Sequence, residues 1–127
     1  MRTGTVPKAG DRHNLRLGRY GENEAARYLK QRGYRILARN YRCPHGEIDI
    51  ICSREGILVF VEVKTHTSQC CGAPQEAVTP KKIGHIRHSA LRFVAEKRLP
   101  FSELRFDVIA ILQRADGWQL EHIESAF

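Results

Sequence analysis

Two charged side chains interrupt an otherwise apolar segment near the middle of the chain. Residues 57–64 are rich in isoleucine, valine and phenylalanine, yet Glu62 and Lys64 lie near the end of this segment. In a β-strand these two side chains project to one side, roughly 6–7 Å apart. Charges at the end of a buried strand are costly unless they are paired or bind an ion. The pattern therefore predicts either a Glu–Lys pair at a fraying strand end or part of a catalytic site.

A predicted strand just before this segment carries two more carboxylates. A four-residue hairpin loop over residues 53–56 places Asp49 opposite Phe60 and Glu47 opposite Glu62. Residues that oppose each other across a hairpin share a face, so both acids lie on the face of the two charges described above. A loop one residue longer or shorter reverses the face, and the prediction depends on this length.

A predicted helix over residues 18–33 supplies a further acid. Ala25, Ala26 and Leu29 form one apolar stripe on this helix, and Glu22 lies in the middle of that stripe. One interpretation is a carboxylate in the first helical turn that the helix dipole favours. The other is a glutamate that points across the sheet toward the two strand carboxylates.

Several carboxylates beside one lysine are suited to phosphate chemistry. Carboxylate oxygens are the ligands of hard divalent cations such as Mg2+ or Mn2+, and Mg2+ commonly bridges to phosphate oxygens. Such a cation can lower the pKa of a bound water and stabilise charge that develops on phosphate oxygens, while a lysine orients the water or neutralises that charge. This chemistry requires no covalent nucleophile.

The distribution of charge along the chain favours a polyanionic partner. The 127 residues include 21 Lys and Arg against 14 Asp and Glu, a formal net charge of +7. Residues 1–42 and 79–98 carry +8 and +5, whereas residues 43–78 and 99–127 carry −3 each. Basic segments around concentrated carboxylates favour a polyanion that is brought to a metal site.

A second helix is predicted over residues 79–98. Thr79 is a good N-cap and Pro80 suits the first helical position, after which Ile83, Ile86, Ala90, Leu91 and Val94 form an apolar face. Basic side chains cluster on the opposite side, either as a solvated helix face or as phosphate contacts. The predicted nucleic-acid-binding residues are Lys81, Lys82, His85, His88 and Arg92.

The predicted elements follow the order αβββαββ. The expected strands cover residues 34–42, 46–52, 57–64, 104–112 and 118–123. Residues 1–17 are expected to form a disordered basic arm, residues 65–78 a mobile loop, and residues 18–127 a single domain.

Composition indicates a cytoplasmic protein. The longest apolar runs are five residues, too short for a membrane span, and no signal-peptide core precedes residue 17. In a reducing compartment we expect the cysteines to be free thiols. Because Cys43, Cys52, Cys70 and Cys71 lack the paired spacing typical of zinc sites, a zinc-containing adaptor is the weakest alternative.

Five segments together carry a family resemblance. They are residues 18–22 (GRYGE), 46–49 (GEID), 59–64 (VFVEVK), 105–108 (RFDV) and 122–127 (HIESAF). In these segments the chain resembles the YraN-like family of uncharacterised bacterial proteins. That family is placed in the restriction-endonuclease-like, or PD-(D/E)xK, nuclease superfamily near archaeal Holliday-junction resolvases. The chain departs from the PD-(D/E)xK motif at one position, because Ile48 rather than proline precedes Asp49.

The resemblance implies a mixed central sheet flanked by helices, with Asp49 and Glu62 as metal ligands. Lys64 would then be the catalytic lysine and Glu22 an accessory acid. We expect a Mg2+-dependent or Mn2+-dependent endonuclease that acts on structured or branched DNA, with a homodimer as an expected form for cutting two strands. The alternative is a nucleic-acid-binding protein with the same fold that does not catalyse cleavage.

Overall fold

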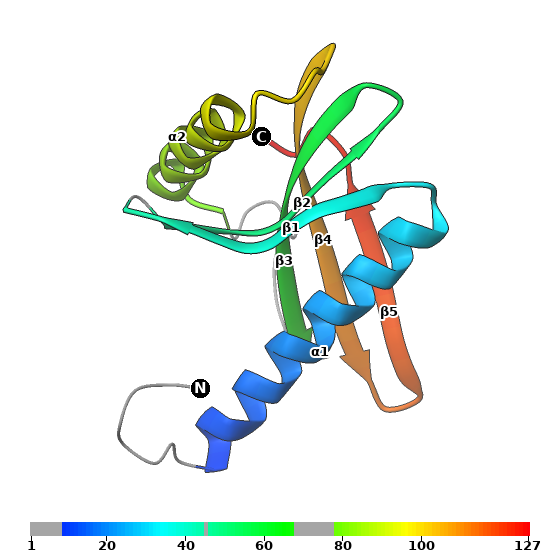
Figure 1. The fold of residues 1–127 in the computed structure, drawn as a ribbon. Helices are drawn as coiled ribbons and strands as arrows, with labels where there is room; N and C mark the ends of the chain where they lie inside the picture. The colour runs from blue at the N-terminus through cyan, green and yellow to red at the C-terminus, as the bar shows by residue number, and fades with distance from the viewer. Residues whose placement is uncertain (1–8, 45, 68–77) are drawn as a thin grey trace.

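Two helices enclose a five-stranded mixed sheet in the computed structural model of the chain, which describes residues 9–44, 46–67 and 78–127 (Figure 1). The elements follow the predicted order αβββαββ. Their bounds are α1 Ala9–Gln31, β1 Arg35–Cys43, β2 Gly46–Arg54, β3 Ile57–Thr67, α2 Pro80–Lys97, β4 Glu103–Arg114 and β5 Gly117–Ile123. The predicted mixed α/β fold class is confirmed.

The sheet contains one parallel pair among antiparallel neighbours, in the spatial order β1-β2-β3-β4-β5. Strands β1, β2 and β3 form an antiparallel meander, β3 pairs with β4 in parallel, and β5 is antiparallel to β4. Because parallel neighbours need a crossover connection, α2 occurs between β3 and β4 in the chain. The central strand β3 is buried on both faces from Leu58 to Val61, as its apolar sequence predicts.

Each helix covers a different face of the sheet. On α1, Ala25, Ala26 and Leu29 form the predicted stripe and pack in one core cluster with side chains of β2, β3 and β4. On α2, buried residues pack in a second cluster against the other face, but the predicted apolar face of this helix is partly wrong. Leu91 is 63% exposed, whereas Phe93 is buried and contacts the ring of Phe60.

The predicted β2–β3 register is wrong by two residues. The turn contains only Glu55 and Gly56, both with positive φ (52° and 81°), so Arg54 pairs with Ile57. Two residues with positive φ are typical of the tight type I′ hairpin, whose twist matches that of the flanking strands. Because the error is an even number of residues, the side chains in the paired part of the two strands keep their predicted faces.

The first helix begins earlier than predicted. Residues 9–17, which we expected to belong to a disordered arm, form the first part of α1, whereas residues 1–8 lie outside the described residues. Gly33 follows the helix with φ of +87°, as predicted for a C-terminal stop.

Within the predicted loop over residues 65–78, β3 continues to Thr67, and residues 68–77 lie outside the described part of the chain. Neither helix is long and apolar enough to span a membrane in the described residues.

Asp107 is the centre of a buried polar network on β4 and β5. Its carboxylate accepts two hydrogen bonds from the Arg105 guanidinium (2.8 and 2.9 Å) and one from the backbone N–H of Ser125 (3.1 Å). His122 Nε2 lies 2.7 Å from the same carboxylate, and Tyr28 Oη lies 3.0 Å from His122 Nδ1. These contacts tie the C-terminal segment to β4, which gives Asp107 a structural role.

Candidate active site

Strands β2 and β3 separate at Asp49. Their paired register ends at Ile50 and Val61. Beyond this point, the backbone N–H of Val63 on β3 donates a hydrogen bond to Asp49 Oδ2 at 2.8 Å. Ile48 packs in the α2 cluster while Ile50 packs in the α1 cluster, although simple alternation would put both on one face. Strand β2 therefore turns at this point and runs toward α2, while β3 continues beside β4 (Figure 1).

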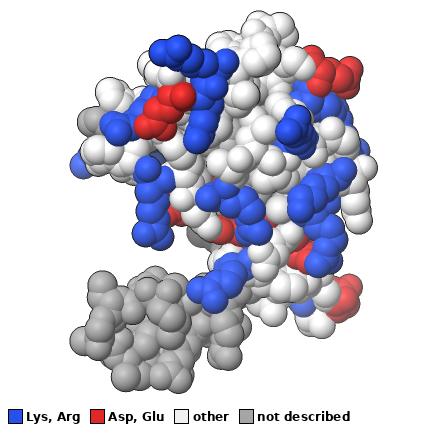
Figure 2. All heavy atoms as spheres, viewed as in Figure 1, with Lys and Arg blue, Asp and Glu red and all other residues white. Residues whose placement is uncertain are grey.

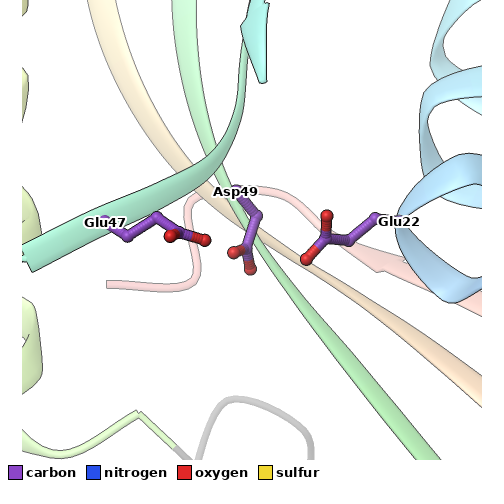
Figure 3. A group of neighbouring side chains, drawn as sticks. All are labelled: Glu22, Glu47 and Asp49. Carbon is purple, nitrogen blue, oxygen red and sulfur yellow. The ribbon is translucent and has the colours of Figure 1, made fainter. Parts of the chain in front are cut away.

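Three carboxylates from two elements converge where the strands separate. Each of Glu22 on α1 and Glu47 and Asp49 on β2 offers one oxygen, and these three oxygens lie within 4.8 Å of one another. Figure 3 shows Glu22 and Glu47 pointing toward Asp49 from opposite sides. Asn40 Nδ2 donates to Glu22 Oε1 at 3.0 Å and to Glu47 Oε2 at 3.2 Å, so its amide bridges the two outer acids. Among the described residues this group has the geometry to share one cation.

The close approach of α1 to β3 positions Glu22. Gly21 packs against the side chain of Thr65, which is the residue after Lys64 on β3. A residue without a Cβ at this position lets the helix backbone come close to the strand. Glu22 is consequently held near the strand carboxylates, with a quarter of its side chain still exposed.

Two lysines from different elements share one oxygen of Glu62. Glu62 is only 4% exposed, and Lys64 Nζ lies 3.2 Å from its Oε2. Lys82, in the first turn of α2, forms an ion pair with the same oxygen. Burial alone would lower the pKa of the Lys82 ammonium, but the Glu62 carboxylate raises that pKa overall. The predicted Glu62–Lys64 neighbourhood is present, and it includes a second cation.

Asp49 has an unusual protonation equilibrium. Burial, the largest cause, together with the negative charge of Glu62, raises the pKa of its carboxyl to about 7. Glu22 and Glu47 act in the same direction, while the hydrogen bond from the Val63 N–H opposes them. When the β2–β3 register is continued by one residue, Asp49 lies opposite Glu62, which explains their electrostatic coupling.

The predicted nucleic-acid-binding residues on α2 fall into two groups. Lys82 points to Glu62, whereas the other four are exposed: Lys81, His85, His88 and Arg92. A pocket of about 250 Å³ between β2 and the first turns of α2 is lined by Gly46, Glu47, Thr79, Lys81, Lys82, His85 and Ile86. Figure 2 shows basic side chains spread over the viewed face, with carboxylates recessed between several of them. Farther along α2, Arg92 is already paired with Glu96 at 3.3 Å.

Three residues of the site were absent from the predicted catalytic set. The sequence places Glu47 on the correct face, and its spacing of two residues from Asp49 is the available signal. Lys82 precedes the buried Ile86 by four positions, which indicates a side chain turned toward the sheet. Asn40 has no local signal, because its contact with the two acids depends on how β1 packs beside β2 and α1.

The fold and the site define a class of mixed α/β protein in which carboxylates and lysines meet where two strands separate. A model of the uncharacterised protein family UPF0102 matches residues 21–111, and the chain belongs to this family. This is the YraN family that the sequence resembles, so the expected membership is confirmed.

Relatives of the same family match over nearly their full lengths. The chain is 43% identical to a UPF0102 protein of Syntrophomonas wolfei over 114 residues, which covers 90% of this chain and 99% of that protein. It is 49% identical to a UPF0102 protein of Geotalea uraniireducens, with 90% and 91% covered. A UPF0102 protein of Syntrophus aciditrophicus is 47% identical, with 90% of each chain covered.

Proposed function

We propose that the chain is a Mg2+-dependent or Mn2+-dependent endonuclease that hydrolyses phosphodiesters in structured or branched DNA. One observation carries this proposal: the carboxylates of Glu22, Glu47 and Asp49 converge, and Asp49 is also coupled electrostatically to Glu62, which holds Lys64. The resemblance to restriction-endonuclease-like nucleases supports the same reaction. We further propose that the protein acts in the cytoplasm and that a homodimer cuts two strands.

The donor set fits a hard divalent cation. Glu22, Glu47 and Asp49 offer only carboxylate oxygens, which Mg2+ and Mn2+ prefer, and the three oxygens are close enough to face one ion. Glu62, one of the two ligands predicted from the sequence, is not one of these three converging carboxylates and is paired with Lys64 and Lys82 instead. A bound cation would acidify a water and stabilise charge on the phosphate oxygens.

Lys64 is the residue best placed to act on the attacking water. Its stem comes from the rigid central strand, its Nζ is fixed by Glu62 Oε2, and its side chain keeps 22% exposure toward solvent. An ammonium held in this way can orient a water molecule and neutralise charge on the phosphate. Glu62 thus serves to position Lys64.

The exposed residues of α2 would hold the DNA backbone. Lys81 and His85 line the pocket beside Glu47, which is next to the proposed metal site. Basic side chains bind phosphates without reading base sequence, and their contribution falls as salt rises. Shape rather than sequence is therefore the expected basis of substrate choice.

A catalytically silent DNA-binding protein is the second candidate, and one observation favours it. Glu62 already has two ammonium partners, so a buried carboxylate that is neutralised in this way can serve as a structural charge network. In that case the cluster would hold α2 against β3 without binding a divalent cation.

Cleavage of labelled DNA separates the two candidates. Four-way junction, flap and linear duplex substrates would be incubated with Mg2+ or Mn2+ and with wild type, Glu62→Gln or Lys64→Ala. We expect the wild type to cut branched substrates and each variant to lose about 100-fold or more in rate. Glu121→Ala and Lys30→Ala, at exposed positions, are the matched controls and should cut like wild type.

Two results would contradict an enzymatic role. If wild type binds branched DNA but never cuts it, the silent binding protein is the better description. If Glu62→Gln and Lys64→Ala cut as fast as wild type, the catalytic assignment is wrong.

A further inference from the structure

Lys82 stands at the junction of the proposed metal site and the pocket beside α2. Thr79 caps α2 by accepting a hydrogen bond from the Lys82 N–H, and Pro80 begins the helix, so the backbone of Lys82 is fixed. From this position its Nζ reaches Glu62 Oε2, while its side chain also lines the pocket. Lys82 therefore borders both the buried carboxylate of Glu62 and the pocket.

The two lysines on Glu62 differ in how easily they can leave it. Lys64 belongs to the central strand and is 22% exposed, whereas Lys82 is 42% exposed and comes from a helix outside the sheet. A long, half-exposed lysine stem can adopt other rotamers at little cost. Neutralising one buried carboxylate requires only one positive charge, so Glu62 can keep Lys64 and release Lys82.

The adjoining pocket gives the Lys82 ammonium a second position. Lys81 and His85 line the pocket and give it a positive side, and its volume of about 250 Å³ is sufficient for a phosphate group. Glu47 lines the same pocket and also belongs to the three-carboxylate group. A cation that neutralises Glu47 would make the pocket more favourable for a phosphate.

We propose that Lys82 couples cation binding to phosphate binding, and this inference rests on the proposed function. Its ammonium neutralises Glu62 while the carboxylates hold no divalent cation. When they bind one, the ammonium turns into the pocket and contacts a DNA phosphate next to the site of cleavage. Lys82 is then a positioning residue that keeps the metal-free site electrically balanced and contributes to substrate binding only in the metal-bound site.

Binding of Mn2+ alone, without DNA, tests the first half of this coupling. Isothermal titration or the electron paramagnetic resonance signal of free Mn2+ would give the affinity of wild type, Lys82→Met and Lys82→Gln. We expect both variants to bind Mn2+ about three- to tenfold more tightly, because a competing positive charge is removed. Lys30→Met removes the same charge from an exposed side chain in the last turn of α1 and should change the affinity much less.

Binding of an uncleaved junction tests the second half. Junction affinity would be compared in Ca2+ and in EDTA, because Ca2+ provides a hard cation for the same oxygens. Wild type should bind the junction more tightly in Ca2+ than in EDTA, and Lys82→Met should lose most of this difference. Reciprocal coupling of this kind is required if one side chain links the two sites.

The outcomes separate this inference from the proposed function. The coupling would be overturned if both Lys82 variants bound Mn2+ no more tightly than wild type. The metal site would still stand in that case if Asp49→Asn abolished Mn2+ binding. Mn2+ binding that is absent from wild type, or unchanged in Asp49→Asn, would overturn both. Thermal unfolding of each variant shows whether it folds. If Lys82→Met does not fold, Lys82→Gln is the variant to use, because its amide can still form a hydrogen bond with Glu62.

Discussion

Gly21 of α1 and Thr65 of β3 are so close that no side chain fits between them. A Cβ on Gly21 would lie well inside van der Waals contact of Thr65 Oγ1 and 3.3 Å from its Cβ. The contact is immediately before Glu22 and immediately after Lys64, so it sets the distance between the helix and the strand that carry them. The packing of one glycine therefore controls the geometry of the proposed metal site.

Gly21→Ala should destabilise the protein although alanine is the better helix former. Overpacking costs roughly 1–3 kcal/mol, which exceeds the gain of up to about 1 kcal/mol from helix propensity. Gly18→Ala, one turn earlier on α1 with no neighbouring atom within 4 Å of its new Cβ, should instead be stabilising. Urea unfolding measures both changes.

A double-mutant cycle identifies the cause of the Gly21→Ala effect. Thr65→Ala removes the hydroxyl that the new methyl group meets, so Gly21→Ala combined with Thr65→Ala should recover most of the lost stability. Additive losses in the double variant would show that Thr65 is not responsible.

Asp49→Asn should stabilise the metal-free protein at alkaline pH. The pKa of Asp49 is raised from an ordinary value of 3.8 to about 7 by burial and the neighbouring carboxylates. A raised carboxyl pKa means that the folded state binds the proton more tightly, so its contribution favours folding at low pH and is lost as pH rises from about 4 through 7. Each unit of pKa corresponds to about 1.4 kcal/mol, which predicts a gain of a few kcal/mol for the variant at pH 8.

Thermal unfolding in EDTA across this pH range measures the Asp49 effect. The difference between Asp49→Asn and wild type should be small near pH 4 and should grow toward pH 8. Asp116→Asn, at an exposed turn, is the control and should show no such growth. A difference that stays constant with pH would contradict the raised pKa.

Asp107→Asn should be among the most destabilising single substitutions in the chain. It leaves the Arg105 guanidinium, which is only 10% exposed, without its buried carboxylate partner, and such losses cost about 3–5 kcal/mol. Burial would raise the pKa of Asp107, but hydrogen bonds from His122 and Arg105 lower it overall. Its stabilising contribution is therefore present above about pH 4 and is lost below it.

Urea unfolding at pH 7 and at pH 3 checks the Asp107 prediction. The cost of Asp107→Asn should be large at pH 7 and smaller at pH 3, where the wild-type carboxyl begins to be protonated. A cost below about 1 kcal/mol at pH 7 would show that Arg105 finds another partner.

Lys81→Met and Arg92→Met should affect DNA binding differently, although both residues are exposed on α2. Lys81 lines the pocket next to Glu47, and its loss should reduce the dependence of log affinity on log salt by about one. Arg92 is already paired with Glu96, so its replacement should change that slope less. Fluorescence anisotropy with a labelled junction at several salt concentrations measures both slopes. Equal changes would indicate that Arg92 leaves Glu96 to contact phosphate.

The sequence was sufficient to predict the order of elements because the apolar periodicity changes clearly from α1 to the strands. It also placed Asp49 and Glu62 on one face, because an error of two residues in the hairpin does not change side-chain alternation. The error itself arose because Glu55 adopts positive φ, which its residue type does not indicate.

Other parts of the site depend on contacts between distant elements. The turn of β2 at Asp49 brings the α1 side of the sheet, with Glu22, close to the α2 side, with Glu62, and no local pattern predicts it. Asn40 joins Glu22 and Glu47 for the same reason. The side chain of Lys82 was placed among the exposed basic residues because helical spacing alone does not indicate that Glu62 lies within its reach.

The two-residue turn at Glu55 and Gly56 divides the site into two complementary halves along the chain. Glu22, Glu47 and Asp49 all precede it, whereas Glu62, Lys64 and Lys82 all follow it. A single cut in this exposed turn would leave one fragment with three acids and another with both lysines. Recovery of metal binding on mixing the fragments would therefore report directly on pairing between β2 and β3, which makes the turn a natural point for a split-protein assay.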